Sequence, residues 1–524
     1  MNWNTLIPAP LYTEQKNQYN ETFPLSSQVA LLCEHAPSAE IFARLMAVDF
    51  KLFLKINSDR SATELESEYT AASLPFILLQ KNSELQAEEY SMRISPGSMK
   101  IQAGDREGFI HAYHSIKQFL LALPKESFPQ EHFSQNKADD RIFQIRCAVI
   151  ADRPAVPWRG AMLDVSRHLF PVDFILRFID LLALHHLNIF HWHLTDDQGW
   201  RIGVPGYPKL LEVGAWRDDM TTEHGRYGGY YSEEEIRRVV EYAYHRGVTV
   251  VPEIDLPGHV SAAIAAYPEL SCRKETIEVP VRHGIYEDIL CAGTPEVYTF
   301  IEALVRQVCS LFPSEYLHLG GDECPTTRWE ECVACKSVMQ QHGLDKALYL
   351  QGLLMNYAVR IAKNFGKKII TWDEVLSVKP DFRPITAVWR DVRYIKDAVA
   401  ANLQVVVSPC QTGTYLDHKH LDDPNEPGRL GVSTVKDVYS LDIFENLSIE
   451  EQALILGGQG NLWTEEVKYG RQVEYMAFPR LSALAESLWL PAKNKDWPRF
   501  TEAIKVHLLR LERLGAQPYR GALE

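Results

Sequence analysis

The sequence predicts a (β/α)₈ barrel that follows a separate α+β domain. From about residue 157 onward, short apolar runs alternate with stretches of helical periodicity, the pattern of a parallel sheet. There are eight such runs, which is the number of strands in a (β/α)₈ barrel. The chain of 524 residues is long enough for a barrel of about 250 residues or more and at least one further domain.

The first domain is expected over residues 1–152, and its reactive side chains do not cluster. Helical periodicity, short apolar runs and a Pro-Gly turn define its elements. In chain order these are a helix over residues 38–52 capped by Ser38, a strand over 76–79, a hairpin of strands over 90–94 and 99–101 about Pro96-Gly97, and a helix over 107–121.

The barrel is expected over residues 153–495. Helical stretches fall between most of its strands: Ser232 and Glu235 form a capping box, and Thr294 followed by Pro295 begins another helix. An amphipathic helix then defines a C-terminal extension, residues 496–524, which we expect to pack on the barrel. The eight expected strands cover residues 160–165, 187–194, 248–254, 316–319, 368–372, 385–389, 403–407 and 454–458.

Composition and charge argue against two kinds of partner. The formal net charge of -15 disfavours binding to a phosphate backbone, which a basic patch would have to hold. The opening residues lack the segments of a signal peptide, and no later stretch has the length of a membrane span. We therefore expect no nucleic-acid or membrane partner, and a cytoplasmic location, or a periplasmic or secreted one if a leader was removed.

The nine cysteines do not resemble a disulfide framework. Cys332 and Cys335 form a CxxC motif with Cys324 nearby, so a metal or redox role has to be considered. No fourth ligand at suitable spacing stands out, and we therefore expect ordinary thiols or one local disulfide. A Cys272–Cys291 bridge across a loop stays open.

The stretch YLHLGGDEC, residues 316–324, places two adjacent carboxylates after an apolar strand and two glycines. Taken alone, it is most simply a turn in which Asp322 caps the next helix. The other strand ends decide against that interpretation, because a barrel builds its active site from residues that follow its strands. Nearly every expected strand is followed by a carboxylate, and three of them also by a tryptophan, Trp372, Trp389 or Trp463.

Carboxylates mixed with indole faces favour a sugar site, since indoles stack on pyranose rings and carboxylates accept from hydroxyls. A metal-dependent hydrolase is an alternative, because His191 and His193 alternate on one strand and point to one face. Such a site would also need an aspartate after the eighth strand, where Trp463 and Glu465 stand. We expect the two histidines to make buried hydrogen bonds, and we expect neither a metal nor a cofactor.

Several of these segments resemble glycoside hydrolase family 20, the β-N-acetylhexosaminidases, in the family's order. The resemblance covers about residues 157–490, and the first 150 residues are similar to the family's non-catalytic, zincin-like domain. The segments are RGAMLDVSRH at 159–168, HWHLTDDQGWRI at 191–202, VPEIDLPGH at 251–259, HLGGDEC at 318–324 and those around Trp372, Trp389, Tyr415 and Trp463.

The resemblance implies a role for each matching residue. Glu323 would be the general acid/base, and Asp322 would hold the 2-acetamido group of the substrate. Arg159 would bind the hydroxyls at carbons 3 and 4, with Glu465 at the same end of the sugar, while Tyr415 would hydrogen-bond the acetamido oxygen and Asp417 the outer hydroxyls. The walls of the pocket would be formed by Trp372, Trp389 and Trp463. The acids would be supported by Asp164, His193 and His259.

Adjacent carboxylates suit only one of the retaining mechanisms. The usual mechanism needs two carboxyls about 5 Å apart across the sugar, whereas neighbouring residues point in different directions. Substrate-assisted hydrolysis needs one proton-transfer carboxyl, because the 2-acetamido oxygen is the nucleophile. The resemblance thus implies exo-acting, retaining removal of terminal β-linked N-acetylglucosamine or N-acetylgalactosamine. We expect burial among tryptophans and carboxylates to raise the pKa of Glu323.

Two alternatives remain at this stage. One is a retaining glycosidase with Glu253 or Glu374 as its nucleophile. The other is a non-catalytic amino-sugar-binding protein, against which the intact Asp322-Glu323 pair argues. The sequence leaves the sugar epimer, the glycan source and the oligomeric state open.

Overall fold

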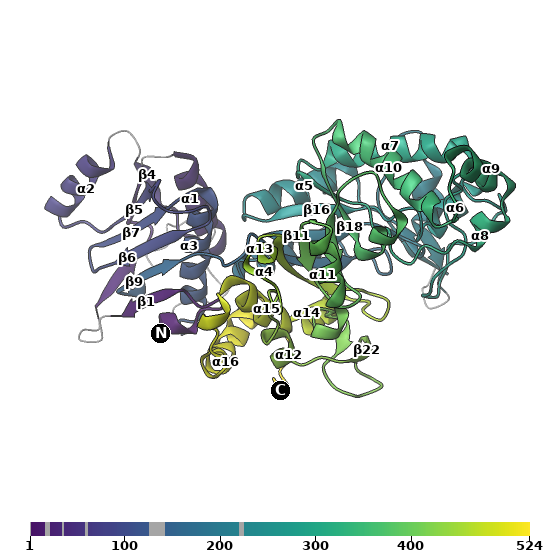
Figure 1. Ribbon diagram of the computed structural model, residues 1–524. Coiled ribbons are helices and arrows are strands. Elements are labelled where there is room, and N and C mark those ends of the chain that lie inside the picture. The colour runs from purple at the N-terminus through teal and green to yellow at the C-terminus, as the bar shows by residue number, and fades with distance from the viewer. Residues whose placement is uncertain (1, 16–20, 34–35, 58–60, 125–141, 220–224) are drawn as a thin grey trace.

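The computed structural model describes residues 2–15, 21–33, 36–57, 61–124, 142–219 and 225–524. It shows a sheet domain beside a larger barrel domain, with the C-terminal helices where the two meet (Figure 1). β9, the last strand of the sheet domain, ends at Asp152, and β10, the first barrel strand, begins at Trp158.

A seven-stranded sheet in the order β1-β9-β6-β7-β5-β3-β4 forms the N-terminal domain. Successive residues of β3 face opposite sides: Leu31 joins the core under α1 and α3, whereas Leu32 packs with Leu65 of α2. The bounds are β1 Tyr12–Gln15, β3 Ala30–Cys33, α1 Ala36–Phe50, β4 Lys55–Asn57, α2 Ala62–Ala71, β5 Phe76–Lys81, β6 Tyr90–Ile94, β7 Ser98–Ala103, α3 Arg106–Leu121 and β9 Ala148–Asp152, with β2 Thr22–Leu25 and β8 Phe143–Arg146 paired separately.

The expected hairpin of β6 and β7 is confirmed, and the two strands pair antiparallel. The expected cap at Ser38 is wrong. α1 already begins at Ala36, so that Ser38 lies buried within its first turn rather than before it.

Eight parallel strands close into the predicted barrel in chain order. The last strand, expected over residues 454–458, extends to Leu462. Gly457 has a φ of +148°, and a Cβ there would lie 1.9 Å from the carbonyl oxygen of Trp158 on the neighbouring strand. The bounds are β10 Trp158–Asp164, β11 Ile189–His193, β16 Thr249–Glu253, β17 Tyr316–His318, β18 Lys368–Trp372, β19 Ile385–Val388, β20 Val405–Val407 and β23 Ile455–Leu462.

Helices surround the barrel, and the longer ones such as α4, α5 and α7 pack an apolar face against it. The predicted capping box of Ser232 and Glu235 starts α5, and Pro295 is the first residue of α7. The main helices are α4 Val172–Leu184, α5 Glu233–Tyr244, α7 Pro295–Leu311, α10 Tyr349–Lys363, α11 Arg393–Ala400, α14 Gly470–Ala477 and α15 Arg480–Trp489. Shorter ones are α6 Ser261–Ala266, α8 Thr327–Glu331, α9 Val333–His342, α12 Val435–Tyr439 and α13 Ile449–Gln452.

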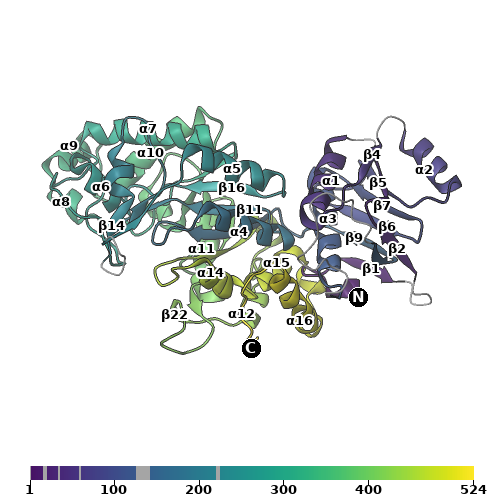
Figure 2. The ribbon, with the colours of Figure 1, turned by 180° about the vertical axis from the view of Figure 1, so that it is seen from behind.

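The last helix, α16 Trp497–Arg513, contacts both domains (Figure 2). On the barrel side, Nε2 of His507 lies 2.8 Å from Nε2 of His185. On the other side, Arg510 donates to the carbonyl oxygens of Gln118 and Thr5 at 2.7 and 2.6 Å. The C-terminal helix therefore joins the sheet domain to the barrel.

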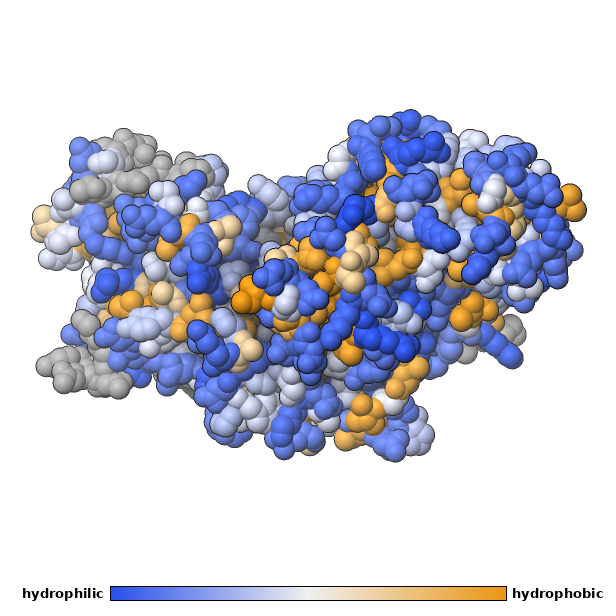
Figure 3. Space-filling model, in the orientation of Figure 1, coloured by the Kyte–Doolittle hydropathy of each residue, from blue (hydrophilic) through white to orange (hydrophobic). Residues whose placement is uncertain are grey.

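Hydrophilic residues cover most of the face shown in Figure 3, and its apolar residues gather near the centre, around α13. Within the described part of the chain, none of the helices combines the length and the apolar character needed to cross a bilayer.

Candidate active site

The carboxyl ends of the barrel strands surround a pocket of about 280 Å³. This is the end of the fold at which barrel enzymes place their chemistry. The pocket is lined by Arg167, His259, His283, Gly284, Ile285, Asp322, Glu323, Trp372, Trp389, Tyr415, Arg429, Leu430, Trp463 and Glu465.

An unusual backbone path after β17 places the acid pair. Gly320 and Gly321 have φ angles of +61° and +97°. Glycine is required at the first of them, because a Cβ there would lie 1.8 Å from Oδ1 of Asp255. Glu323 itself has a φ of +45°, which is strained for a residue with a side chain. Such strain persists where surrounding contacts enforce it and concentrates at functional sites.

Asp322 lies beside a second buried carboxyl, that of Asp255. Oδ1 of Asp255 accepts from the amide of Gly321 at 2.9 Å. Burial, and then the charge of Asp255, raise the pKa of Asp322, while burial raises the pKa of Asp255 to about 7. Two carboxyls this close do not titrate independently, and the negative charge of Asp255 opposes the ionisation of Asp322. The sequence placed Asp255 at a strand end among several acids but did not single it out.

Glu323 faces a histidine, which reverses the expected direction of its pKa. Nε2 of His259 lies 3.6 Å from Oε2 of Glu323 and 3.8 Å from Oδ2 of Asp322. The interaction with the His259 imidazolium lowers the pKa of Glu323 and outweighs burial, which acts the other way. The predicted raised pKa is therefore wrong for the free protein. Because the Glu323 side chain is 36% exposed, a sugar that covers it would remove water and push its pKa upward.

His259 is held in its charged form by two buried aspartates. Burial disfavours the imidazolium, but the charge of Asp196 and the hydrogen bonds of Asp196 and Asp197 raise the pKa of His259 well above its usual value. Nδ1 lies 3.0 Å from Asp197 and 3.3 Å from Asp196. His193 contacts Asp322 and Glu323 indirectly. Its Nε2 lies 2.8 Å from Asp196, which in turn contacts His259.

Asp164 does not support the acid pair as predicted. Its Oδ1 accepts from the backbone amides of Ser166 and Arg167 at 2.8 and 3.1 Å, and its Oδ2 accepts from the amide of Thr464 at 3.2 Å. The carboxylate therefore joins the loops that follow the first and last barrel strands. Its contribution to the site is to position Arg167.

Arg159 is not a substrate-binding residue, because it lies at the opposite end of the barrel. It is the second residue of β10 and is fully buried. Its guanidinium donates to Glu88 of the sheet domain and to the carbonyl oxygens of Val156 and His186. Burial alone would raise the pKa of Glu88, but Arg159 and His111 lower it to about 2. Arg159 therefore fastens the two domains together.

Arg167, which the sequence analysis missed, is the arginine at the pocket end of the same strand. Its Nη2 lies 2.9 Å from Asp196 and its Nη1 3.4 Å from Asp164, while Nε donates to Gln198 at 2.9 Å. Two of the five guanidinium N–H groups remain to meet a ligand. The rule that barrel sites lie past the strand ends would have selected Arg167, three residues beyond β10.

Arg167→Lys is expected to lower kcat/KM about 10- to 100-fold, mainly through KM. Lysine keeps the positive charge but lacks the planar, forked set of donors. A hydrogen bond to a charged group, such as the one that would be lost, contributes about 1.5–3 kcal/mol. Steady-state kinetics on an aryl N-acetylglucosaminide would measure this. Arg159→Lys is the matched control: it should lower the melting temperature and leave kcat/KM of the folded protein unchanged. If Arg159→Lys lowered kcat/KM and Arg167→Lys did not, Arg159 would be the arginine that binds the sugar.

Three indoles and a tyrosine form the pocket walls, as the sequence predicted. Nε1 of Trp372 donates to Glu253 at 2.8 Å, and Nε1 of Trp389 donates to Glu374 at 2.9 Å. The ring of Tyr415 stacks on Trp389 with centroids 6.1 Å apart. These bonds fix the ring planes, so that the walls are formed before a ligand arrives.

Two acids and Arg429 define the far end of the pocket. Arg429 donates to Asp417 at 3.0 Å and pairs with Glu465 at 2.9 Å. Oδ1 of Asp417 and Oε2 of Glu465 are buried and have no hydrogen-bond partner among the described residues. Burial raises the pKa of Asp417 to about 7 although Arg429 opposes the shift. Since buried acceptors are normally paired, these atoms suit the hydroxyls of a ligand. Glu465 lines the wall, whereas Asp417 lies behind Arg429.

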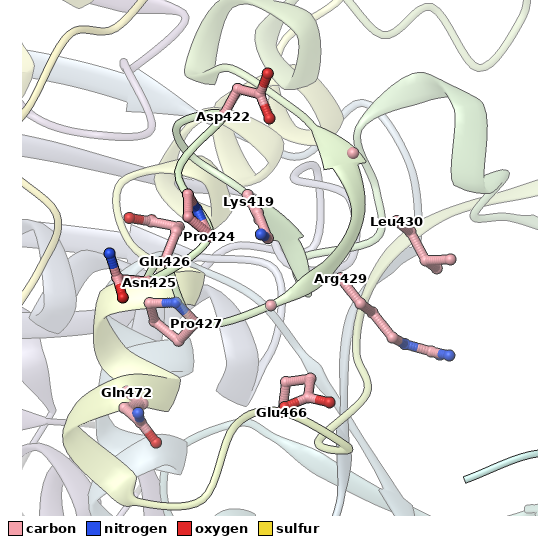
Figure 4. A pocket seen from close by; sticks show the side chains of 12 residues that line it. Lys419, Asp422, Pro424, Asn425, Glu426, Pro427, Arg429, Leu430, Glu466 and Gln472 are labelled. Atoms are coloured by element: carbon pink, nitrogen blue, oxygen red, sulfur yellow. The ribbon is translucent and has the colours of Figure 1, made fainter.

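The loop between β21 His418–Lys419 and β22 Arg429–Val432 lines a second cavity, which Figure 4 shows. Pro424, Pro427 and Glu426 of this loop line that cavity. Arg429 and Leu430 project from the other side of the loop, and both also line the sugar pocket. The loop thus forms part of the pocket rim.

Neither candidate nucleophile for a two-carboxylate mechanism suits that role. Glu253 is fully buried among His191, His193 and His318, whose charges lower its pKa although burial acts in the opposite direction. Glu374 bonds Trp389, and burial followed by the charge of Asp322 raises its pKa to about 9. The raised pKa disfavours the carboxylate form that a nucleophile needs, and Glu374 is not among the described residues that line the pocket.

The predicted role of His191 and His193 in buried hydrogen bonding agrees with the contacts. His191 accepts from Gln459 at 2.9 Å and lies 3.0 Å from Glu253. His193 bonds both Glu253 and Asp196. Both histidines are buried beneath the floor of the pocket rather than in its lining.

The pocket has indole walls, and a strained acid follows the fourth strand of the parallel barrel. These features define a carbohydrate-cleaving hydrolase. The family model described as glycosyl hydrolase family 20, catalytic domain, matches residues 156–492, and the model for domain 2 of the same family matches residues 4–152. The chain belongs to glycoside hydrolase family 20.

Relatives and solved structures agree with this assignment. A β-hexosaminidase of Porphyromonas gingivalis is 33% identical over 97% of this chain, which spans only 63% of that relative. A β-hexosaminidase of Akkermansia muciniphila is 30% identical, with 92% of this chain and 94% of the relative covered. A crystal structure of a family 20 exo-β-N-acetylglucosaminidase from Vibrio harveyi with N-acetylglucosamine has a TM-score of 0.85 at 29% identity and covers 99% of this chain and 79% of that one.

Proposed function

We propose that the protein is an exo-acting, retaining β-N-acetylhexosaminidase whose nucleophile is the 2-acetamido oxygen of its substrate. The observation that carries this proposal is the pairing of one partly exposed acid with one buried acid. Glu323 opens to the pocket, whereas Asp322 is 8% exposed and tied to Asp255. In the described part of the chain the pocket wall contains one further acid, Glu465, which Arg429 pairs at the far end.

In the first step, Glu323 gives its proton to the glycosidic oxygen as the bond from that oxygen to carbon 1 breaks. The acetamido oxygen attacks carbon 1, and an oxazolinium ion forms. Asp322 accepts a hydrogen bond from the acetamido N–H and stabilises the positive charge that develops there. The carboxyls of Asp322 and Asp255 titrate together, so that the pair keeps one negative charge directed at the substrate.

In the second step, the Glu323 carboxylate takes a proton from a water molecule that attacks carbon 1. The bond between carbon 1 and the acetamido oxygen breaks, the acetamido group is restored, and the sugar leaves with its original configuration. His259 contacts both acids and sets their pKa values, so the same imidazolium serves both steps.

The pocket favours single terminal sugars. Its volume of about 280 Å³ lies at the lower end of the range for small-molecule sites, enough for one ring. His283, Ile285 and Leu430 line its mouth together with the indole walls. A polymer that ran through the site would have to displace these side chains, which supports exo action.

A hydrolysis panel tests this function. Terminal β-linked N-acetylglucosaminides and N-acetylgalactosaminides should be cleaved, with release of one sugar at a time and inhibition by a thiazoline that mimics the oxazolinium ion. Relative kcat/KM values identify the preferred epimer. Binding without hydrolysis of either sugar would favour the non-catalytic alternative.

His259→Gln is expected to shift the whole pH profile of kcat/KM to higher pH by about one unit. The imidazolium lowers the pKa of Glu323 and opposes the raised pKa values of Asp322 and Asp255, so its removal raises all three. Activity needs a protonated Glu323 together with an ionised aspartate. The pKa of Glu323 lies below those of the two aspartates in the free protein, so Glu323 sets the acidic limb of kcat/KM and the aspartates set the alkaline limb. Both limbs therefore move upward. The exposed His342 on α9 provides a control, His342→Gln, whose profile should match the parent; an unmoved His259→Gln profile would contradict this assignment.

A further inference from the structure

Four cysteines from two distant segments meet beside the active site. Cys272 and Cys291 flank a loop before α7, and Cys332 and Cys335 stand at the start of α9. Their Sγ atoms all lie within 4.8 Å of one another. The sequence analysis found no fourth ligand for the CxxC motif, because two of the partners lie more than forty residues earlier in the chain.

The sulfur positions fit a metal better than they fit disulfides. Sγ of Cys335 lies 3.7 Å from that of Cys272 and 3.6 Å from that of Cys291, which is 3.9 Å from that of Cys332. A disulfide needs about 2.05 Å between sulfurs. A tetrahedral Zn²⁺ with Zn–S bonds of about 2.3 Å places its four sulfurs about 3.8 Å apart. All four cysteines are free thiols, so neither the local disulfide nor the Cys272–Cys291 bridge that the sequence left open is formed among them.

The surrounding backbone holds the two pairs together. Gly293 packs directly on the CxxC segment, since a Cβ there would lie 2.4 Å from the carbonyl carbon of Ala334. Cys291 and Cys335 are buried, whereas Cys272 and Cys332 are partly exposed. The ten-residue helix α9 directs its N-terminal dipole at the cluster, which favours thiolates there.

We propose that Cys272, Cys291, Cys332 and Cys335 form a tetrathiolate zinc site with a structural role. Four protein ligands complete the tetrahedron and leave no position for a substrate or an activated water. This proposal departs from the expectation that the protein holds no metal and that the CxxC motif consists of ordinary thiols or one local disulfide. The site lies outside the pocket lining.

The site ties the wall of the sugar pocket to the segment that follows the acid pair. The loop between Cys272 and Cys291 has little regular structure, and it carries His283, Gly284 and Ile285 into the pocket lining. Besides the cysteines, it is held by surface pairs such as that between Arg328 and Asp288, 3.6 Å apart. Gln198 and Trp329 also donate to the carbonyl oxygens of Arg282 and Leu290 in this loop, each at 2.9 Å, and the metal would add to this restraint.

Metal analysis of the purified wild-type protein, kept free of added oxidant and reductant, is the primary test. We expect about one zinc per chain and no visible absorption. Any of three results would overturn the proposal: a zinc-free protein with four additional reactive thiols, a mass lower by the hydrogens of two disulfides, or a red iron centre. This readout needs no substrate, so zinc in an inactive protein would sink the proposed function alone, and activity without zinc would sink the metal site alone.

Cysteine variants locate the metal. Cys335→Ser is expected to lose the zinc, and Cys309→Ala, a buried cysteine of α7 outside the cluster, should keep it. If Cys335→Ser does not fold, Cys272→Ser removes a partly exposed ligand instead. A protease should cut the loop between Cys272 and Cys291 faster in a zinc-free variant. On the basis of the proposed function, the KM of such a variant should rise several-fold, and its kcat should change less. Zinc retained in Cys272→Ser and Cys335→Ser would contradict the assignment.

Discussion

Glu323→Gln is expected to lower kcat about 10²- to 10⁴-fold, the usual contribution of a positioned general acid and base, with little change in KM. The amide keeps the shape of the side chain but can neither give a proton to the leaving oxygen nor take one from water. The loss should shrink for substrates with activated leaving groups, which depart without a proton. Steady-state kinetics across a leaving-group series would measure both effects.

Glu331→Gln is the matched control for this variant. It makes the same chemical change eight residues later, on an exposed side chain at the end of α8. Its kinetics and melting temperature should equal those of the parent. Near-parental activity of Glu323→Gln would remove Glu323 from the proposed mechanism.

Asp322→Asn is expected to lower kcat about 10²- to 10³-fold, the magnitude reported for loss of one preorganised electrostatic contact. The variant keeps the side-chain volume but loses the charge that stabilises the oxazolinium ion. It also removes the carboxyl that titrates together with Asp255. Because the charge develops in the transition state, the loss should appear in kcat more than in KM.

Thiazoline affinity gives an independent check of the Asp322 assignment. The thiazoline carries the ring of the intermediate, so its affinity should fall in parallel with kcat in Asp322→Asn. The exposed Asp345 provides the control, Asp345→Asn, for which both quantities should stay unchanged. Parental thiazoline affinity in Asp322→Asn would show that Asp322 acts elsewhere.

The barrel was predictable because its information is local. Each strand is a short apolar run, and Ser232 with Glu235 or Pro295 marks a helix start within a few residues. β10 begins two residues before its expected start, and β23 ends four residues after its expected end. Gly457 of β23 makes a close approach to Trp158 that depends on the neighbouring strand. Periodicity and capping could not supply that contact.

The site was predictable where a motif and a strand end coincide, as at Asp322 and Glu323. The motif implied Arg159, but this residue lies at the start of β10, far from the pocket. Arg167 follows the pocket end of the same strand. The direction of the Glu323 pKa depends on a charged His259, and that charge depends on two aspartates brought in from another loop. Such through-space couplings are invisible in a linear motif.

The cysteine cluster shows the same limit at longer range. The CxxC motif was visible, but its partners are 41 and 63 residues away along the chain. Only the fold brings Cys272 and Cys291 to the start of α9. A local search for a fourth ligand therefore had no means of finding them.

The central claim is that the nucleophile belongs to the substrate. A series of aryl β-glycosides with N-acetyl, N-fluoroacetyl, N-difluoroacetyl and N-trifluoroacetyl groups tests it most directly, because each fluorine weakens the amide oxygen as a nucleophile. The proposed mechanism predicts that kcat/KM falls steeply at every step, and that the corresponding 2-hydroxyl glycoside is not hydrolysed. A rate that stays level across the series, or ready cleavage of the 2-hydroxyl glycoside, would contradict it.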